Sequence, residues 1–205
     1  MYSRLPSLVI GFHGCDISTF QKVVCDSGEL TPSNNNYDWL GNGIYFWEQN
    51  YDRALQWAKE QAERGRVSEP AVVGAVIDLG YCLNLTDSHY TGLLKNEYRL
   101  MKQEFQQLGL DMPKNTGRTE DLLLRKLDCA VIEHLHHRME GRREAEQAEG
   151  VEPFDSARGL FSEGDRIYPG AGIREKTHVQ ICVRNPNCIK GYFAPREADP
   201  AWRIP

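Results

Sequence analysis

The sequence lacks any hydrophobic segment long enough to cross a membrane, and near its N-terminus the longest apolar run is Leu8–Phe12. A membrane helix needs about 20 apolar residues, and a secretory signal needs a hydrophobic stretch of about 7–15. A C-x-x-C pair is also lacking, because the six cysteines are scattered at 15, 25, 82, 129, 182 and 188. We therefore expect a cytoplasmic protein with reduced thiols and no membrane partner.

Positive charge is not in excess either: 24 Lys and Arg stand against 29 Asp and Glu, a net charge of -5. No basic stripe with interleaved aromatics favours binding to duplex nucleic acid, although a site for one nucleotide or a single-stranded end stays open. The 205 residues show no internal repeat and no domain seam, so we expect a single domain over 1–205. Its charged segment 139–152 is expected to be a solvated helix end or a mobile loop.

Hydrophobic periodicity and turn residues predict an irregular order of strands and helices. The expected strands cover 8–12, closed by His13-Gly14, then 43–47, 71–79 with 82–85 as a continuation, 178–183 and 188–193. The expected helices cover 16–27, 50–64, 88–108 and 119–140, with loops at 28–36 and 159–172. The turn at Asn185-Pro186-Asn187 predicts that the last two strands pair with each other. Strands without regular βα alternation favour an α+β domain.

Three segments hold polar or aromatic residues that packing alone explains poorly. His13 follows an apolar strand and is flanked by glycine, where a ligand can approach the backbone, or it simply caps the strand. Strand alternation puts Tyr45 and Trp47 on one face, suited to stacking on a flat heterocycle or to core packing. His178 and Gln180 share a face of a late strand, which is either a site or an exposed sheet face.

Taken in order, these segments resemble the motifs of the ADP-ribosyltransferase superfamily. The likeness is to its His-Tyr-Glu branch, which includes the poly(ADP-ribose) polymerases and many bacterial toxins. His13-Gly14 is similar to the first motif, and Gly41–Phe46 followed by Arg53-Ala54 is similar to the second. The resemblance implies an α+β fold with a split antiparallel β-sandwich core and flanking helices. It leaves residues 86–150 unexplained.

The resemblance also implies roles for individual residues. NAD would be the substrate, with no metal. His13 would bond the adenosine-side ribose, the backbone of Gly14 would hold the nicotinamide carboxamide, and the ring of Tyr45 would stack on nicotinamide. The cofactor-binding set would be completed by the loop residues Ser33 and Asn34, by Gly43, and by the aromatic walls Trp47 and Trp57.

The third motif departs from the family pattern, because Gln180 stands where the branch has glutamate. Glutamine can hydrogen-bond a ribose hydroxyl, but it cannot stabilise a developing cation by charge. A second candidate acid is Glu163, on a loop that Gly159 and Gly164 would let close over the cleft; Glu175 is a weaker third. This pattern disfavours polymer elongation and favours transfer of one unit.

The leading hypothesis is a mono-ADP-ribosyltransferase acting on a protein or nucleic-acid acceptor, in the manner of a toxin or phage-defence effector with an antitoxin or immunity partner. The alternatives are an inactive NAD- or nucleotide-binding module and an NAD glycohydrolase. A metal site at Cys129, His134, His136 and His137 is disfavoured, since His134 and His137 lie with Glu133 and Arg138 on what we expect to be a solvated helix face.

Overall fold

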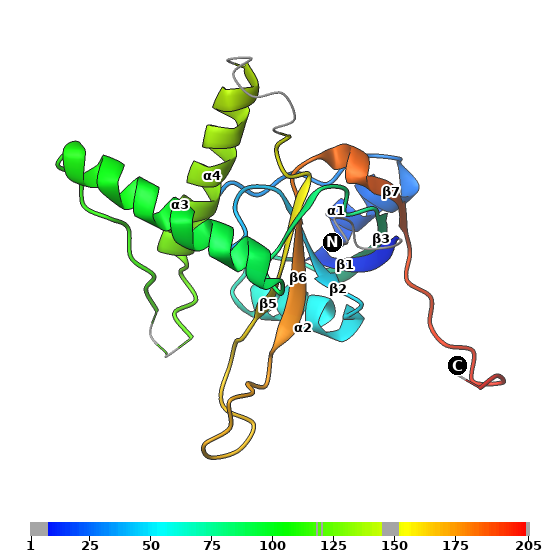
Figure 1. Ribbon diagram of the computed structural model, residues 1–205. Coiled ribbons are helices and arrows are strands. Elements are labelled where there is room, and N and C mark those ends of the chain that lie inside the picture. The colour runs from blue at the N-terminus through cyan, green and yellow to red at the C-terminus, as the bar shows by residue number, and fades with distance from the viewer. Residues whose placement is uncertain (1–7, 118, 120, 145–151, 204–205) are drawn as a thin grey trace.

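The computed structural model describes residues 8–117, 119, 121–144 and 152–203 (Figure 1). Its seven strands form a sheet in the order β4-β5-β6-β2-β1-β3-β7. The strands are β1 Val9–Asp16, β2 Ile44–Glu48, β3 Pro70–Ile77, β4 Cys82–Asn84, β5 Ser156–Phe161, β6 His178–Val183 and β7 Ile189–Phe193. The helices are α1 Ile17–Phe20 with η1 Gln21–Cys25, α2 Tyr51–Glu63, α3 Ser88–Gln107, α4 Lys126–Glu144 and the short η2 Pro186–Cys188.

The sheet is divided into two halves at its centre. All eight residues of β1 pair with β3, and four residues of β2 pair with β6. Between β1 and β2, in contrast, the described ladder holds only Gly11 with Glu48 and Phe12 with Trp47. All neighbouring pairs are antiparallel except β4 with β5. The predicted α+β class with a split, mainly antiparallel core is therefore confirmed.

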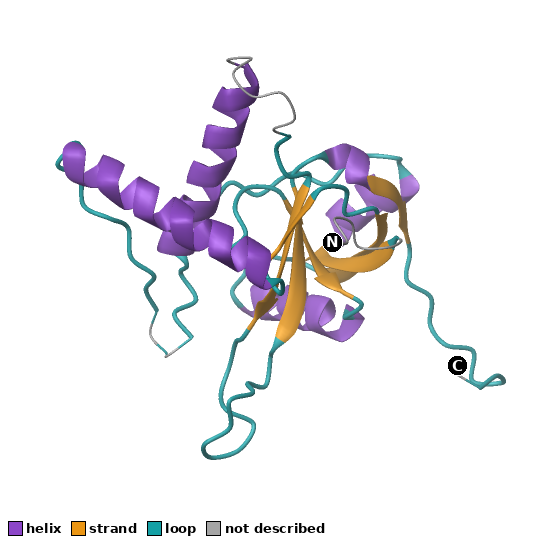
Figure 2. Cartoon of the chain, viewed as in Figure 1, coloured by secondary structure: helices purple, strands orange, loops and turns teal. Residues whose placement is uncertain are grey.

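The two halves enclose the main hydrophobic core. Ile44 and Phe46 of β2 and Ile181 of β6 belong to the same buried cluster as Val73 and Ala75 of β3. Burying such side chains contributes about 1.5–3 kcal/mol each. The long helices α3 and α4 contact each other beside the β4-β5-β6 half, whereas α2 packs against β1 and β3 of the other half (Figure 2). None of the described helices is long and apolar enough to span a bilayer.

Local sequence signals placed most of the helices correctly. Asp16 caps α1 by accepting from the Ser18 backbone N–H, and Asn50 caps α2 by accepting from that of Arg53. The predicted charged segment 139–152 is helical as far as residue 144, and residues 145–151 lie outside the described part. The helix predicted at 119–140 begins only at Lys126, after an irregular stretch in which Thr116 bridges Leu124.

Strand pairing was predicted less well. The first strand does not end at His13-Gly14 but continues to Asp16, because β3 pairs with it throughout. The predicted loop 159–172 begins inside strand β5. Residues 82–84 do not continue β3, because Gly80 turns the chain at a φ of 57° and β4 joins the far edge beside β5.

The predicted pairing of the last two strands is wrong. Both edges of β6 are already occupied, by β5 and β2, so the chain must leave after Val183. It passes through η2 and returns as β7 at the opposite edge, against β3. The Asn-Pro-Asn signal correctly marked a turn, but a turn does not decide which strand becomes the neighbour.

Candidate site at the split in the sheet

The candidate site lies where β1 and β2 separate. The backbone oxygen of Ile10 accepts from Gln49 N–H, so the even-numbered residues of β1 direct their backbone groups toward β2. Gly14 is the next even residue after Phe12, and its ladder partner would be Tyr45. The described ladder stops two residues earlier, at Phe12 and Trp47. The N–H and C=O of Gly14 are therefore directed at the split.

The side chain of His13 bonds to the backbone carbonyl of Tyr45, the group to which the Gly14 N–H would donate if the ladder continued. Its Nδ1 lies 2.8 Å from the backbone oxygen of Tyr45. Since a carbonyl only accepts, Nδ1 must carry the proton, which leaves Nε2 as an acceptor in the neutral ring. Burial lowers the pKa of His13, and the bond to the Tyr45 carbonyl acts in the opposite direction. The imidazole thus bridges the two halves of the sheet.

Helix α2 closes the split from one side. A Cβ added to Gly14 would lie 2.2 Å from the backbone oxygen of Ala54 and 3.3 Å from the Trp57 ring. The contact explains why a glycine must follow His13 and why Ala54, which is fully buried, follows Arg53. It also places the predicted residue Trp57 beside the Gly14 backbone.

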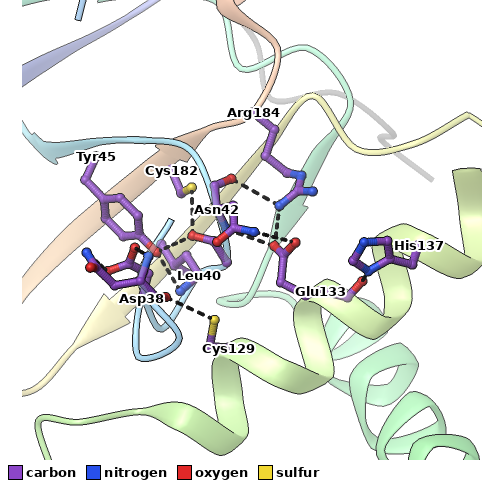
Figure 3. Close-up of polar contacts among 11 residues, drawn as sticks. Asp38, Leu40, Asn42, Tyr45, Cys129, Glu133, His137, Cys182 and Arg184 are labelled. Atoms are coloured by element: carbon purple, nitrogen blue, oxygen red, sulfur yellow. Dashed lines mark hydrogen bonds and ion pairs between the residues drawn. The ribbon is translucent and has the colours of Figure 1, made fainter. Parts of the chain in front are cut away.

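Tyr45 is held rigidly on the other side. Its hydroxyl donates to the backbone oxygen of Gly41 at 2.8 Å and accepts from the N–H of Leu40 at 3.0 Å (Figure 3). Burial is the main reason that the pKa of Tyr45 lies well above its ordinary value. The ring therefore has a fixed position, which a stacking residue needs.

The Gly-Asn-Gly segment before Tyr45 is fixed by α4. Glu133 accepts from the backbone N–H of Asn42 at 2.8 Å and from its side-chain amide at 2.9 Å, and it pairs with Arg184 (Figure 3). Gly41 has a φ of 83°, and a Cβ there would lie 2.4 Å from Glu133. The expectation that Glu133 belongs to a solvated helix face is wrong, and no local sequence signal revealed this contact.

Gln180 lies on β6, directly across from Trp47 and two residues from Cys182, the partner of Tyr45. It therefore projects from the same face of the β2-β6 half as Tyr45 and Trp47. Its Oε1 accepts a hydrogen bond of 2.5 Å from the indole Nε1 of Trp39. Sequence reasoning assigned no role to Trp39, although an aromatic residue two positions before Gly41 is the signal that could have suggested one.

Several buried polar atoms surround this face without a hydrogen-bond partner among the described residues. They include Nε1 of Trp47, Nε2 of His178 and Nε of Arg53. The Trp47 ring lies 6.1 Å from His178 and 5.8 Å from Trp57, and the Arg53 guanidinium lies over it at 5.7 Å. An unpaired buried polar group costs about 1–3 kcal/mol, so the region suits a polar ligand or ordered water.

Glu163 is anchored to α2. Its Oε2 lies 2.8 Å from Nη2 of Arg53, and the two side chains are only 15% and 5% exposed. Gly159 does not serve as a hinge, because it lies in β5, where a Cβ would be 2.6 Å from the Trp39 ring. The backbone N–H of Gly164, whose φ is 86°, donates to the carboxylate of Asp121 at 3.1 Å. Glu175 is exposed.

The predicted loop residues lie apart from the split. Ser33, Asn34 and Gly43 line a cavity of about 610 Å³ together with residues 152–155 and Arg184. Ser33 and Gly43 exchange backbone hydrogen bonds of 2.8 and 3.0 Å, which close the loop between them. His13, Gly14, Tyr45 and Gln180 do not line this cavity.

The histidines of α4 have separate surroundings. His134 bridges Glu97 at 2.7 Å and Glu104 at 2.9 Å, whereas His136 is fully buried and His137 is exposed. The carboxylate of Glu97, which is 1% exposed, also accepts hydrogen bonds from Nε and Nη2 of Arg138. His134 therefore faces α3 and not the solvent. In the described residues no three His, Cys, Asp or Glu side chains gather as a metal site.

Comparison with known proteins finds a distant relative without an assigned function. A protein of Methanocaldococcus jannaschii, described as uncharacterized protein MJ0359, is 28% identical over 198 residues, covering 87% of this chain and 83% of that protein. No family model matches the chain. No solved structure matches it either.

Proposed function

We propose that the split between β1 and β2 binds NAD and that the protein is a mono-ADP-ribosyltransferase. The observation that supports this best is that Gly14 directs its backbone N–H and C=O at the split, beside the Trp57 ring and opposite the β2 position of Tyr45, whose ring is held in place. A primary carboxamide, such as that of nicotinamide, needs one donor and one acceptor side by side. The two aromatic rings suit a flat heterocycle.

The orphaned polar atoms beside the split support the fit. Trp47 Nε1, Arg53 Nε and His178 Nε2 offer hydrogen-bonding capacity to a polar ligand on the same face as Gln180. Bound NAD supplies a glycosidic bond whose cleavage passes through a cation-like transition state. In this proposal Gly14 holds the leaving group, Tyr45 and Trp57 exclude water, and Gln180 orients the ribose. The lack of a negative charge at Gln180 favours transfer of a single unit.

The remaining parts of the proposal concern the setting. All six cysteines lie in the described part of the chain and are free thiols, which supports a cytoplasmic location. The acceptor would be a macromolecule, either protein or nucleic acid. A role as a toxin or phage-defence effector, with an antitoxin or immunity protein, rests on analogy.

An inactive NAD-binding module is the second candidate, because the side chains of both Gln180 and Glu163 are already engaged. Gln180 accepts from Trp39, and Glu163 pairs with Arg53. Neither arrangement offers an uncompensated carboxylate to a developing cation. An NAD glycohydrolase would differ from the transferase only in the final acceptor, which is water.

Calorimetric titration with NAD, followed by chromatography for nicotinamide, separates these functions. We expect Tyr45→Ala to weaken NAD binding at least tenfold, about 1.4 kcal/mol, while the exposed Tyr98→Ala on α3 binds like the wild type. Label from NAD on a macromolecule indicates the transferase, free ADP-ribose indicates the glycohydrolase, and binding without nicotinamide release indicates the module. Absence of NAD binding by the wild-type protein contradicts the proposal.

A further inference from the structure

We infer that Trp39 is a positioning residue that fixes the amide of Gln180, so that this position turns a hydrogen-bond donor toward a ligand. The inference rests on the proposed function and deepens it, because it sets the polarity of the third position of the site. It follows from the contact between the Trp39 indole and Gln180 and from the way the indole is held.

The chemistry of the indole decides the orientation of the amide. Nε1 of tryptophan can only donate, so the Gln180 atom that lies 2.5 Å from it must be the oxygen. This assignment does not depend on telling oxygen from nitrogen in the side chain. With the oxygen turned toward Trp39, the NH₂ group is the part of the amide that points away from Trp39 and is offered to a ligand.

The Trp39 ring has little freedom to move. It packs against Phe161 with ring centroids 5.0 Å apart. Gly159, which pairs with Gln180 across β5 and β6, leaves the room that the ring occupies, since a Cβ there would lie 2.6 Å from Cη2 of Trp39. The donor is therefore held in place by β5, the strand next to Gln180.

The result is the opposite polarity from that of a carboxylate. A carboxylate in place of Gln180 would accept from Trp39 with one oxygen and from a sugar hydroxyl with the other. The Gln180 amide instead donates, so the ligand atom beside it must be an acceptor such as a ribose or phosphate oxygen. If the ligand is NAD, the Gln180 NH₂ group donates to an oxygen of the nicotinamide-side ribose, so the contact does not require that oxygen to carry a proton.

The contact itself is tested without a ligand. The chain has four tryptophans, so the indole N–H of Trp39 is assigned in a ¹H–¹⁵N spectrum by its loss in Trp39→Phe, with the exposed Trp202→Phe as the matched control. We expect the Trp39 indole signal to move upfield in Gln180→Leu and downfield in Gln180→Glu, where the bond gains charge. A signal that responds to neither substitution overturns the inference.

The polarity is tested with NAD and an analogue carrying fluorine in place of the 2′-hydroxyl of the nicotinamide-side ribose, since fluorine accepts weakly and cannot donate. We expect wild-type protein to bind the two within about threefold and Gln180→Glu to bind the analogue at least tenfold less tightly than NAD. Trp39→Phe lets the amide flip, so the ratio of its affinities for NAD and for the analogue should differ from that of the wild type. Gly159→Ala, which displaces the ring, should behave like Trp39→Phe and covers the case in which that variant folds poorly.

The outcomes separate this inference from the proposed function. Failure of every variant and of the wild type to bind NAD overturns the proposed function and the ligand half of the inference. The inference alone is overturned by a different result. In that result the wild type binds NAD, binds the fluorinated analogue at least tenfold less tightly, about 1.4 kcal/mol, and Gln180→Glu binds the two compounds alike.

Discussion

The imidazole Nδ1 of His13 lies 2.8 Å from the backbone oxygen of Tyr45, where the ladder between β1 and β2 ends. A side chain here replaces a backbone hydrogen bond and keeps the two halves of the sheet together. The same bond leaves the Gly14 amide directed at the split instead of at Tyr45. His13 and Tyr45 are thus linked through the backbone, and their connection creates the feature on which the proposed function rests.

Gly14→Ala is expected to disturb α2 and the split together. The new methyl group would lie 2.2 Å from the Ala54 backbone oxygen, and backbone cannot yield as a flexible side chain can. We expect a loss of about 1–3 kcal/mol in the free energy of unfolding in urea, since overpacking has costs of this size. Gly92→Ala on α3, where a Cβ meets nothing within 4 Å, should instead stabilise by about 0.5–1 kcal/mol. Equal effects of the two substitutions would contradict the close approach.

Glu163→Gln tests the ion pair with Arg53. Because the Arg53 side chain is 5% exposed and its other carboxylate partner, Glu60, lies at 3.9 Å, removing the charge of Glu163 should cost about 1–3 kcal/mol. The exposed Glu175→Gln serves as the control and should change stability by less than about 0.5 kcal/mol. Urea denaturation of both proteins provides the comparison. If Glu163→Gln unfolds at the same urea concentration as the control, the pair contributes no stability and Glu163 is available for another role.

We expect the buried His136 to make the stability of the fold sensitive to acid. Burial, together with the nearby charges of Arg184 and His137, lowers the pKa of His136 to about 3. Its pKa in the unfolded chain is about 6.5, so its contribution to stability is present above pH 6.5 and is lost progressively as the pH falls toward 3. The slope contributed by this one proton reaches about 1.4 kcal/mol per pH unit.

Unfolding measured between pH 4 and pH 7 checks this expectation. His136→Leu should flatten the dependence by about one proton. His137→Gln, at an exposed position, should leave the pH dependence unchanged. If both substitutions change the pH dependence, or if neither does, the acid sensitivity comes from other groups.

Sequence reasoning predicted the motifs better than their surroundings. The α+β class and the starts of α1 and α2 depend on local signals, which short segments carry. The pairing of β6 with β2 and β5, and not with β7, depends on which edges are already occupied. No local pattern contains that information, so the turn at Asn185-Pro186-Asn187 was assigned the wrong strand partner.

The same limit applies to the site. The pattern of glycines and aromatics identified Gly14 and Tyr45, which lie on the two sides of the split. The partners that give Gln180 and Glu163 their character come from elsewhere in the chain: Trp39 is 141 residues from Gln180, and Arg53 is 110 residues from Glu163. Such contacts depend on how the strands assemble, and the spacing of residues in the sequence does not reveal them.

The amide resonance of Gly14 provides the most direct test of the central claim, that the split receives the nicotinamide end of NAD. The account predicts that nicotinamide or NAD shifts this ¹H–¹⁵N signal in a saturable titration, while the amide of Gly191 on the edge strand β7 stays in place. A titration in which NAD binds but shifts residues remote from Gly14, Tyr45 and Trp57, or in which neither compound shifts Gly14, would contradict it.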